Sequence, residues 1–155
     1  IGGFVTQELL DNIDVCILDL APRRLFINIG TNDLSDPAIS IEDMIANYDK
    51  ILTIVQDKLP DIDIYMMAYY PINYDAATEE MKPCLLIRTN DKIAQANEAV
   101  RTLAKAHHAH YIDINAPLKD EQGNLKAEYT IEGMHIKEQG YRAIFDSFIK
   151  YALED

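Results

Sequence analysis

The most constraining feature of this sequence is a regular alternation between short apolar runs and longer stretches with helical periodicity. Residues 24–29 form a mostly apolar run that ends at Gly30, as expected of a strand buried on both faces. Ser40 with Asp43 is typical of a capped helix start, and the apolar residues that follow recur at spacings of three and four until Pro60. This pattern predicts a strand followed by a long amphipathic helix.

The same alternation continues to the end of the chain. Residues 62–69 and 111–114 are expected to be strands, and a helix that opens at Thr89 or Asn90 lies between them. A last helix is expected from about Lys137, with a buried stripe made of Tyr141, Ile144, Phe145, Phe148 and Ile149. Such alternation implies right-handed crossovers and a mostly parallel, flavodoxin-like sheet. We therefore predict one three-layer α/β/α domain over the whole chain.

Charge and composition exclude several classes of protein. The 155 residues carry 26 acidic and 14 basic side chains, a formal charge of −12. This balance argues against nucleic acid or an anionic membrane as a partner, because phosphate binding depends on clustered Lys and Arg. No apolar run approaches the roughly 18–20 residues that span a bilayer. Cys16 and Cys84 are expected to be buried free thiols, and two distant cysteines exclude a disulfide scaffold.

Ligands of parallel α/β sheets bind beyond the carboxyl ends of the strands. This rule selects the Gly30-Thr31-Asn32-Asp33 segment, the loop after Tyr70 and the segment after Ile114. Gly, Asn and Asp are ordinary residues of a tight turn, which is the simpler interpretation of the first segment. Alternatively, Asn32 presents an amide N–H that could stabilise a developing oxyanion.

Two other segments carry candidate chemistry. Glu132 and His135 lie three residues apart, with Gly133 between them to let the backbone turn. They are either surface groups before a helix or the acid–base half of a catalytic triad. Gly2-Gly3 is either a frayed terminus or the source of an unobstructed backbone N–H for an oxyanion.

Together these three segments resemble the SGNH, or GDSL-type, family of esterases and lipases. Ile1-Gly2-Gly3 resembles the second conserved block, with Gly3 at the oxyanion-hole position, and Gly30-Thr31-Asn32-Asp33 resembles the third, with the oxyanion Asn32. Glu132-Gly133-Met134-His135, followed by Gly140-Tyr141, resembles the fifth block, where most members have Asp in place of Glu132. The opening is also similar to the platelet-activating-factor acetylhydrolase branch, and the resemblance covers essentially the whole chain.

The nucleophile of that family is the first point of departure. The family's catalytic serine lies in a Gly-Asp-Ser block before the second block, whereas Ser35, Ser40 and Ser147 have no such context. The resemblance therefore implies that the serine lies upstream of residue 1 and that a first strand–helix–strand unit, roughly 30 or more residues, is absent. We expect the 155-residue chain alone to be inactive on esters and to fold poorly, because a central strand edge would be open.

The second departure from the family's pattern concerns the acid that orients the catalytic histidine. Glu132 is one methylene longer than Asp, although Glu serves as the triad acid on other hydrolase folds. Asp113, near the end of the third strand, is the competing acid. His107, His108 and His110 suggest a metal site, but no complete ligand set accompanies them, and their position at a helix end explains them through the helix dipole. No metal or cofactor is therefore expected.

The resemblance implies a serine esterase or acylhydrolase that cleaves a small carboxylic ester through an acyl-enzyme. His135 would be the base, Glu132 its orienting acid, and Gly3 and Asn32 the oxyanion donors. The expected walls of the substrate pocket are Pro71, Ile72, Asn73, Tyr74 and Met134. The rival hypothesis is a flavodoxin-like or degenerate hydrolase module that binds a carbohydrate or acyl ligand without turnover. A cytoplasmic location is favoured because no signal peptide is visible, and oligomerisation stays open.

Overall fold

A computed structural model describes residues 2–153, so Ile1, where the resemblance begins, lies outside the described residues. The chain divides into two compact units. The first unit comprises Ile1–Tyr69 with Ala94–Ile112, and the second comprises Tyr70–Ile93 with Asp113–Asp155. The single-domain organisation stays a prediction.

The first unit is built on a parallel sheet. Its strands are β1 (Arg24–Ile27), β2 (Asp63–Met67) and β3 (His110–Ile112), in the spatial order β1-β2-β3. β1 pairs in parallel with β2, and β2 pairs in parallel with β3. All three strands lie within or beside the predicted runs, and the parallel α/β fold predicted from the alternation is confirmed.

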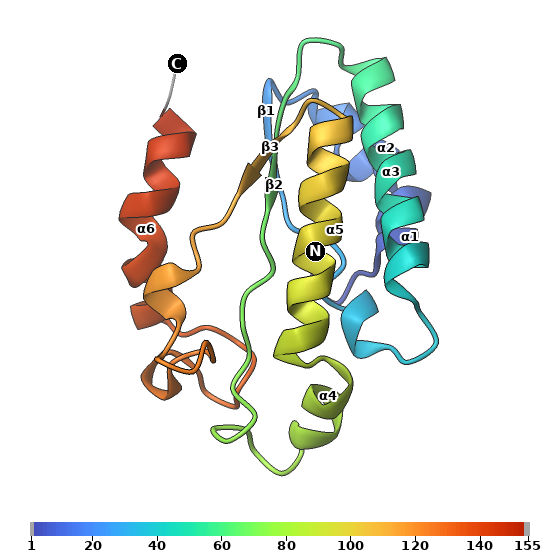
Figure 1. The fold of residues 1–155 in the computed structure, drawn as a ribbon. Helices are drawn as coiled ribbons and strands as arrows, with labels where there is room; N and C mark the ends of the chain where they lie inside the picture. The colour runs from blue at the N-terminus through green and yellow to red at the C-terminus, as the bar shows by residue number, and fades with distance from the viewer. Residues whose placement is uncertain (1, 154–155) are drawn as a thin grey trace. The chain divides into compact units, whose positions relative to one another are not determined.

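Two long helices connect these strands. α3 (Ile41–Lys58) links β1 to β2, and α5 (Asn90–Ala106) precedes β3 and belongs to the first unit from Ala94 onward. In Figure 1 the two helices run along the same side of the sheet, as two right-handed crossovers in one direction require. α3 starts where predicted, because the Ser40 hydroxyl accepts the Asp43 N–H at 3.0 Å. Five residues of the apolar pattern predicted for this helix are buried, namely Met44, Tyr48, Ile51, Leu52 and Val55, whereas Ile41 and Ile45 of the same pattern are half-buried.

The segment before β1 forms short helices that the sequence pattern does not reveal. They are α1 (Thr6–Asp11), α2 (Ile13–Cys16) and the 3₁₀ turn η1 (Leu18–Leu20). α1 contacts α3, where the Asn47 amide donates to the Thr6 hydroxyl at 3.4 Å. Helices of four and six residues are too short to show a 3.6-residue period, so packing rather than periodicity defines them.

The second unit contains α4 (Lys82–Ile87), the first turn of α5, the 3₁₀ turns η3 (Ala116–Leu118) and η4 (Ala127–Tyr129), and α6 (Glu138–Leu153). Its buried apolar side chains are Ile72, Leu85, Ile93, Ile114, Leu118, Leu125 and Ile144. α4 lies in the segment after Tyr70, for which the sequence pattern predicts a loop and no helix. Pro83 lies in the first turn of this helix, where a missing N–H costs nothing.

The stripe predicted for α6 is wrong at two of its five positions, Tyr141 and Phe145, whereas Ile144 is buried and Phe148 and Ile149 are half-buried. Ile144 is 4% exposed, but Tyr141 and Phe145 are 54% and 55% exposed. Within the second unit, α6 contacts η3 and η4, and Gly140 lies against Leu118, Tyr129 and Ile136. The helix therefore packs through the side that carries Gly140 and Ile144. Residue spacing identifies an apolar face but does not specify which part of that face is covered.

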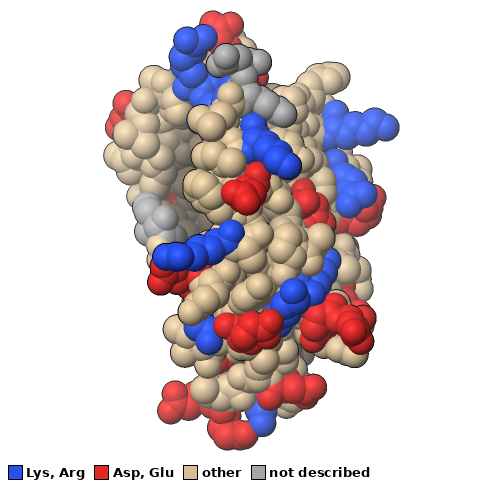
Figure 2. Space-filling view, turned by 90° about the vertical axis from the view of Figure 1, so that its left-hand side faces the viewer, with Lys and Arg blue, Asp and Glu red and all other residues tan. Residues whose placement is uncertain are grey.

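The surface carries many charged side chains, as the composition indicates. On the face drawn in Figure 2, Asp and Glu side chains lie among Lys and Arg side chains. None of the described helices is long and apolar enough to cross a membrane. Cys16 and Cys84 are free thiols, as predicted, but both are half-buried rather than buried.

Candidate active site

The turn after β1 is shaped by Gly30. This residue is buried and has φ +110°, a conformation that side chains with a Cβ rarely adopt. A Cβ here would overlap the Tyr69 hydroxyl and would lie 2.7 Å from Met44 Sδ. The Tyr69 hydroxyl donates to the Ile29 carbonyl at 2.6 Å, so it is held against the turn. Glycine is thus required both for the backbone conformation and for the close approach of Tyr69.

The buried carboxylate of Asp33 fastens α1 to this turn. Asp33 is 1% exposed and begins the 3₁₀ turn η2 (Asp33–Ser35). Its Oδ2 accepts the Thr6 backbone N–H at 2.9 Å, and its Oδ1 accepts a short hydrogen bond from the Thr6 hydroxyl. The sequence pattern predicts only a turn residue at Asp33 and does not reveal this anchoring role, because the partner lies 27 residues away.

The two predicted oxyanion donors both lie in the first unit. Asn32 is half-buried, and its Nδ2 donates to the Phe4 carbonyl at 2.9 Å. An amide nitrogen carries two hydrogens, so one remains for another acceptor. Gly3, next to Phe4, is exposed and has φ +86°, with open space where a Cβ would stand. The structure therefore brings Asn32 to the residue that follows Gly3.

The predicted acid–base pair lies in the second unit and is hydrogen-bonded. His135 Nδ1 is 2.5 Å from Glu132 Oε1, and the same oxygen accepts the His135 backbone N–H at 2.8 Å. The Glu132 side chain is 15% exposed, whereas the His135 side chain is 70% exposed. Burial raises the pKa of Glu132, but the hydrogen bonds from the His135 backbone and ring outweigh burial and hold the pKa below its ordinary value.

This geometry defines the chemistry available to the imidazole. An ionised carboxylate only accepts hydrogen bonds, so Nδ1 carries a proton and donates it to Glu132. In the neutral ring Nε2 is then the basic nitrogen. Because the ring is mostly exposed, this nitrogen can take a proton from a bound group.

Glycine and asparagine build the loop that presents the pair. Gly133 has φ +92°, and a Cβ there would overlap the Asn73 carbonyl oxygen and lie 2.9 Å from the Ala77 Cβ. The Gly133 carbonyl accepts the Asn73 N–H at 2.7 Å. The Asn73 side chain donates to the Leu125 carbonyl at 2.7 Å and accepts the Ala76 N–H at 2.9 Å. Asn73 thus connects three segments of the second unit.

Of the two candidate acids, Glu132 is the one whose carboxylate is hydrogen-bonded to the His135 ring. The Asp113 carboxylate accepts the Asn115 backbone N–H at 2.9 Å, which closes a local turn.

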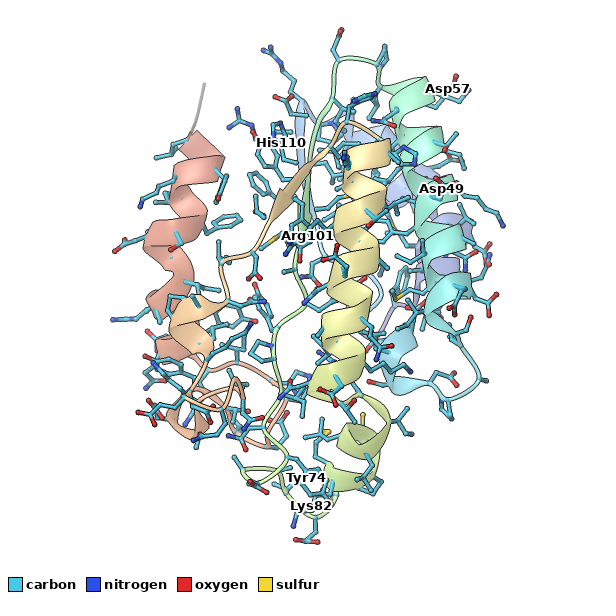
Figure 3. All side chains as sticks on the ribbon, viewed as in Figure 1. Asp49, Asp57, Tyr74, Lys82, Arg101 and His110 are labelled. Atoms are coloured by element: carbon cyan, nitrogen blue, oxygen red, sulfur yellow. The ribbon has the colours of Figure 1, made fainter. Side chains whose placement is uncertain are left out.

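The five residues predicted to line a pocket differ in exposure. Pro71, Ile72 and Asn73 are buried in the second unit, so their side chains offer little surface to a ligand. Tyr74 is 38% exposed and lies beside Lys82, whose ammonium is 6.0 Å from the ring centre (Figure 3). Met134 is half-exposed, and its sulfur accepts a hydrogen bond from Arg88 at 3.2 Å. The lining role of all five stays a prediction.

His107 and His110, near the end of α5, have structural partners. His107 Nε2 lies 2.6 Å from Asp49 Oδ1, and its Nδ1 lies 2.8 Å from Gln56 Oε1. His110 stacks on Tyr65 with ring centres 4.5 Å apart. Within residues 2–153, no three or more His, Cys, Asp or Glu side chains form a group that could hold a metal ion.

Comparisons with known proteins match the chain over most of its length. The model of the GDSL-like lipase/acylhydrolase family matches residues 1–143. A Streptococcus pneumonia protein named for platelet activating factor is 31% identical, with a TM-score of 0.85 over 96% of this chain and 68% of that one. No significant match was found among the curated proteins.

More distant structures share the fold. A GDSL-like lipase from Bacteroides thetaiotaomicron is 22% identical, with a TM-score of 0.78 over 97% of this chain and 71% of that one. A catalytic mutant of an acetylxylan esterase from Geobacillus stearothermophilus is 14% identical, with a TM-score of 0.76 over 99% and 69%.

Proposed function

Because this chain belongs to the GDSL-like lipase/acylhydrolase family, we propose that it carries the acid–base pair and two oxyanion donors of a serine esterase. In this proposal His135 Nε2 takes the proton of a serine hydroxyl as that oxygen attacks the carbonyl carbon of an ester. The same nitrogen then returns the proton to the leaving alcohol, and water repeats the sequence on the acyl-enzyme.

The observation that carries this proposal is the hydrogen bond from His135 Nδ1 to Glu132. A carboxylate in this position holds the reactive tautomer and stabilises the imidazolium that forms during proton transfer. The depressed pKa of Glu132 supports the role, because the group stays ionised at neutral pH.

The Gly3 N–H and the second Asn32 amide hydrogen are the proposed oxyanion donors. Loss of one such donor costs roughly 2.7–4 kcal/mol of transition-state stabilisation in acyl-transfer enzymes. The hydrogen bond from Asn32 to Phe4 supports this assignment, since it joins the two predicted donor segments. The serine is expected on a segment that precedes residue 1, as the resemblance implies, and the substrate is a small carboxylic ester.

The test uses a longer protein that contains these residues together with its upstream serine. We expect turnover of 4-nitrophenyl acetate and labelling of the serine by a fluorophosphonate. His135→Ala should lower kcat by about 10²–10⁴-fold. His108→Asn is the matched control, because this exposed histidine has φ +53°, which Asn tolerates. Absence of both turnover and labelling would instead favour the non-catalytic module.

A further inference from the structure

Thr130 lies at the base of the loop that holds Glu132 and His135. It is 5% exposed, and its hydroxyl makes two hydrogen bonds inside this loop. The hydroxyl donates to the His135 carbonyl at 2.9 Å and accepts the Gly133 backbone N–H at 2.9 Å. Because a carbonyl only accepts and an N–H only donates, the direction of both bonds is fixed. The Thr130 hydroxyl oxygen therefore bonds both the middle of the loop, at Gly133, and its end, at His135.

The surrounding backbone closes the same loop. Thr130 and Ile136 form an isolated antiparallel bridge, and the Lys137 N–H donates to the Tyr129 carbonyl at 2.8 Å. On the other side, the Asn73 N–H holds the Gly133 carbonyl at 2.7 Å. Gly133 is thus bound at its N–H by Thr130 and at its carbonyl by Asn73. The two peptide groups that flank Gly133 therefore have little freedom to rotate.

From this geometry we propose that Thr130 is a positioning residue for the Glu132–His135 pair, an inference that rests on the proposed role of His135 as the base. The Thr130 hydroxyl fixes the His135 carbonyl and the Gly133 N–H, and the Glu132 side chain fixes the His135 N–H and ring. The two side chains together set both the backbone and the imidazole of His135. Thr130 does not touch substrate in this proposal and acts through His135.

The test compares Thr130→Val with Thr130→Ser by NMR of ¹⁵N-labelled protein, in the longer protein that also contains the upstream serine. Valine keeps the shape but removes both hydrogen bonds, whereas serine keeps the hydroxyl. In Thr130→Val we expect loss of the downfield Nδ1–H signal of His135 and mixing of its two tautomers, with a shifted pH titration of the ring. Thr130→Ser should restore the native signals.

Thr89→Val is the matched control. The Thr89 hydroxyl accepts the Lys92 N–H at 3.1 Å at the start of α5, so this variant also loses a threonine hydrogen bond, but outside the loop. Its His135 signals should equal those of the unmodified chain. If Thr130→Val leaves the His135 signals native, or if Thr89→Val changes them equally, Thr130 is only a structural residue and the proposal fails.

A measurement on the unmodified chain covers the case in which Thr130→Val does not fold. Slow hydrogen exchange of the Gly133 amide, relative to exposed loop amides, is expected from its bond to Thr130, and fast exchange would overturn the proposal. None of these signals requires catalysis. Failure of the proposed function would instead appear as absent ester turnover, or as turnover that does not depend on His135, whatever the NMR experiment shows.

Discussion

A single carboxylate oxygen of Glu132 binds His135 twice, through the ring Nδ1 at 2.5 Å and the backbone N–H at 2.8 Å. The two residues are three positions apart, and Gly133 at φ +92° allows the chain to turn between them. The extra methylene of Glu, compared with Asp, is therefore accommodated without losing contact with the ring.

The first prediction concerns the identity of the orienting acid. Glu132→Gln replaces an acceptor with an amide and removes the charge that stabilises the imidazolium, so kcat should fall by about 10²–10⁴-fold in the active protein. Asp113→Asn is the matched control, because that carboxylate accepts the backbone N–H of its own turn, and kcat should stay within about twofold. A larger loss in Asp113→Asn than in Glu132→Gln would reverse the assignment.

The second prediction concerns the stability of the folded protein at low pH. The pKa of Glu132 is lower in the folded chain than its ordinary value, so the folded state binds fewer protons at this site than the unfolded state. Its contribution to stability is present above the unfolded pKa, near 4.3, and is lost as the pH falls through the lower folded value. Urea denaturation of the longer, serine-containing protein at a series of pH values should show a smaller loss of stability below about pH 4.3 in Glu132→Gln than in the unmodified protein. Parallel curves for the two proteins would contradict the expectation.

The third prediction concerns Gly30. Gly30→Ala forces a Cβ into a left-handed conformation and against the Tyr69 hydroxyl and Met44, so it should cost about 2–5 kcal/mol of unfolding free energy. Gly123→Ala is the control, because Gly123 has φ +86° but open space around its Cβ position. It should lose only the backbone strain, about 1–2 kcal/mol, in the same urea denaturation experiment. Equal losses would show that the contacts of Gly30 do not matter.

The sequence predicts the parallel sheet, α3 and α5 because each of these elements is long or apolar enough to show its own period. It does not predict α1 or α4, which are six residues each and form through packing. The exposed Tyr141 and Phe145 have a similar cause, since helical spacing alone does not report which residues find a partner.

The candidate site also contains residues that the sequence predicts and contacts that it does not. Glu132 and His135 are predictable because their contact is local in sequence and the family motif is compact. The supporting contacts are different, since Thr6 reaches Asp33 across 27 residues and Asn73 reaches Leu125 across 52. Such pairs have no periodic signature, and only the folded chain shows them.

The last prediction tests one of these long-range contacts. Thr6→Val removes the hydroxyl that donates to the buried Asp33 carboxylate, whereas the Thr6 backbone N–H still donates to that group. A buried charge that loses a hydrogen bond costs about 1–3 kcal/mol, so the urea midpoint should fall accordingly. Thr53→Val, at an exposed position of α3, should stay within about 0.5 kcal/mol. Because Thr6 follows closely after Phe4, whose carbonyl accepts the Asn32 amide, the variant should also change the Asn32 side-chain NMR signals. An unchanged midpoint together with native Asn32 signals would show that Asp33 does not anchor the proposed oxyanion donors.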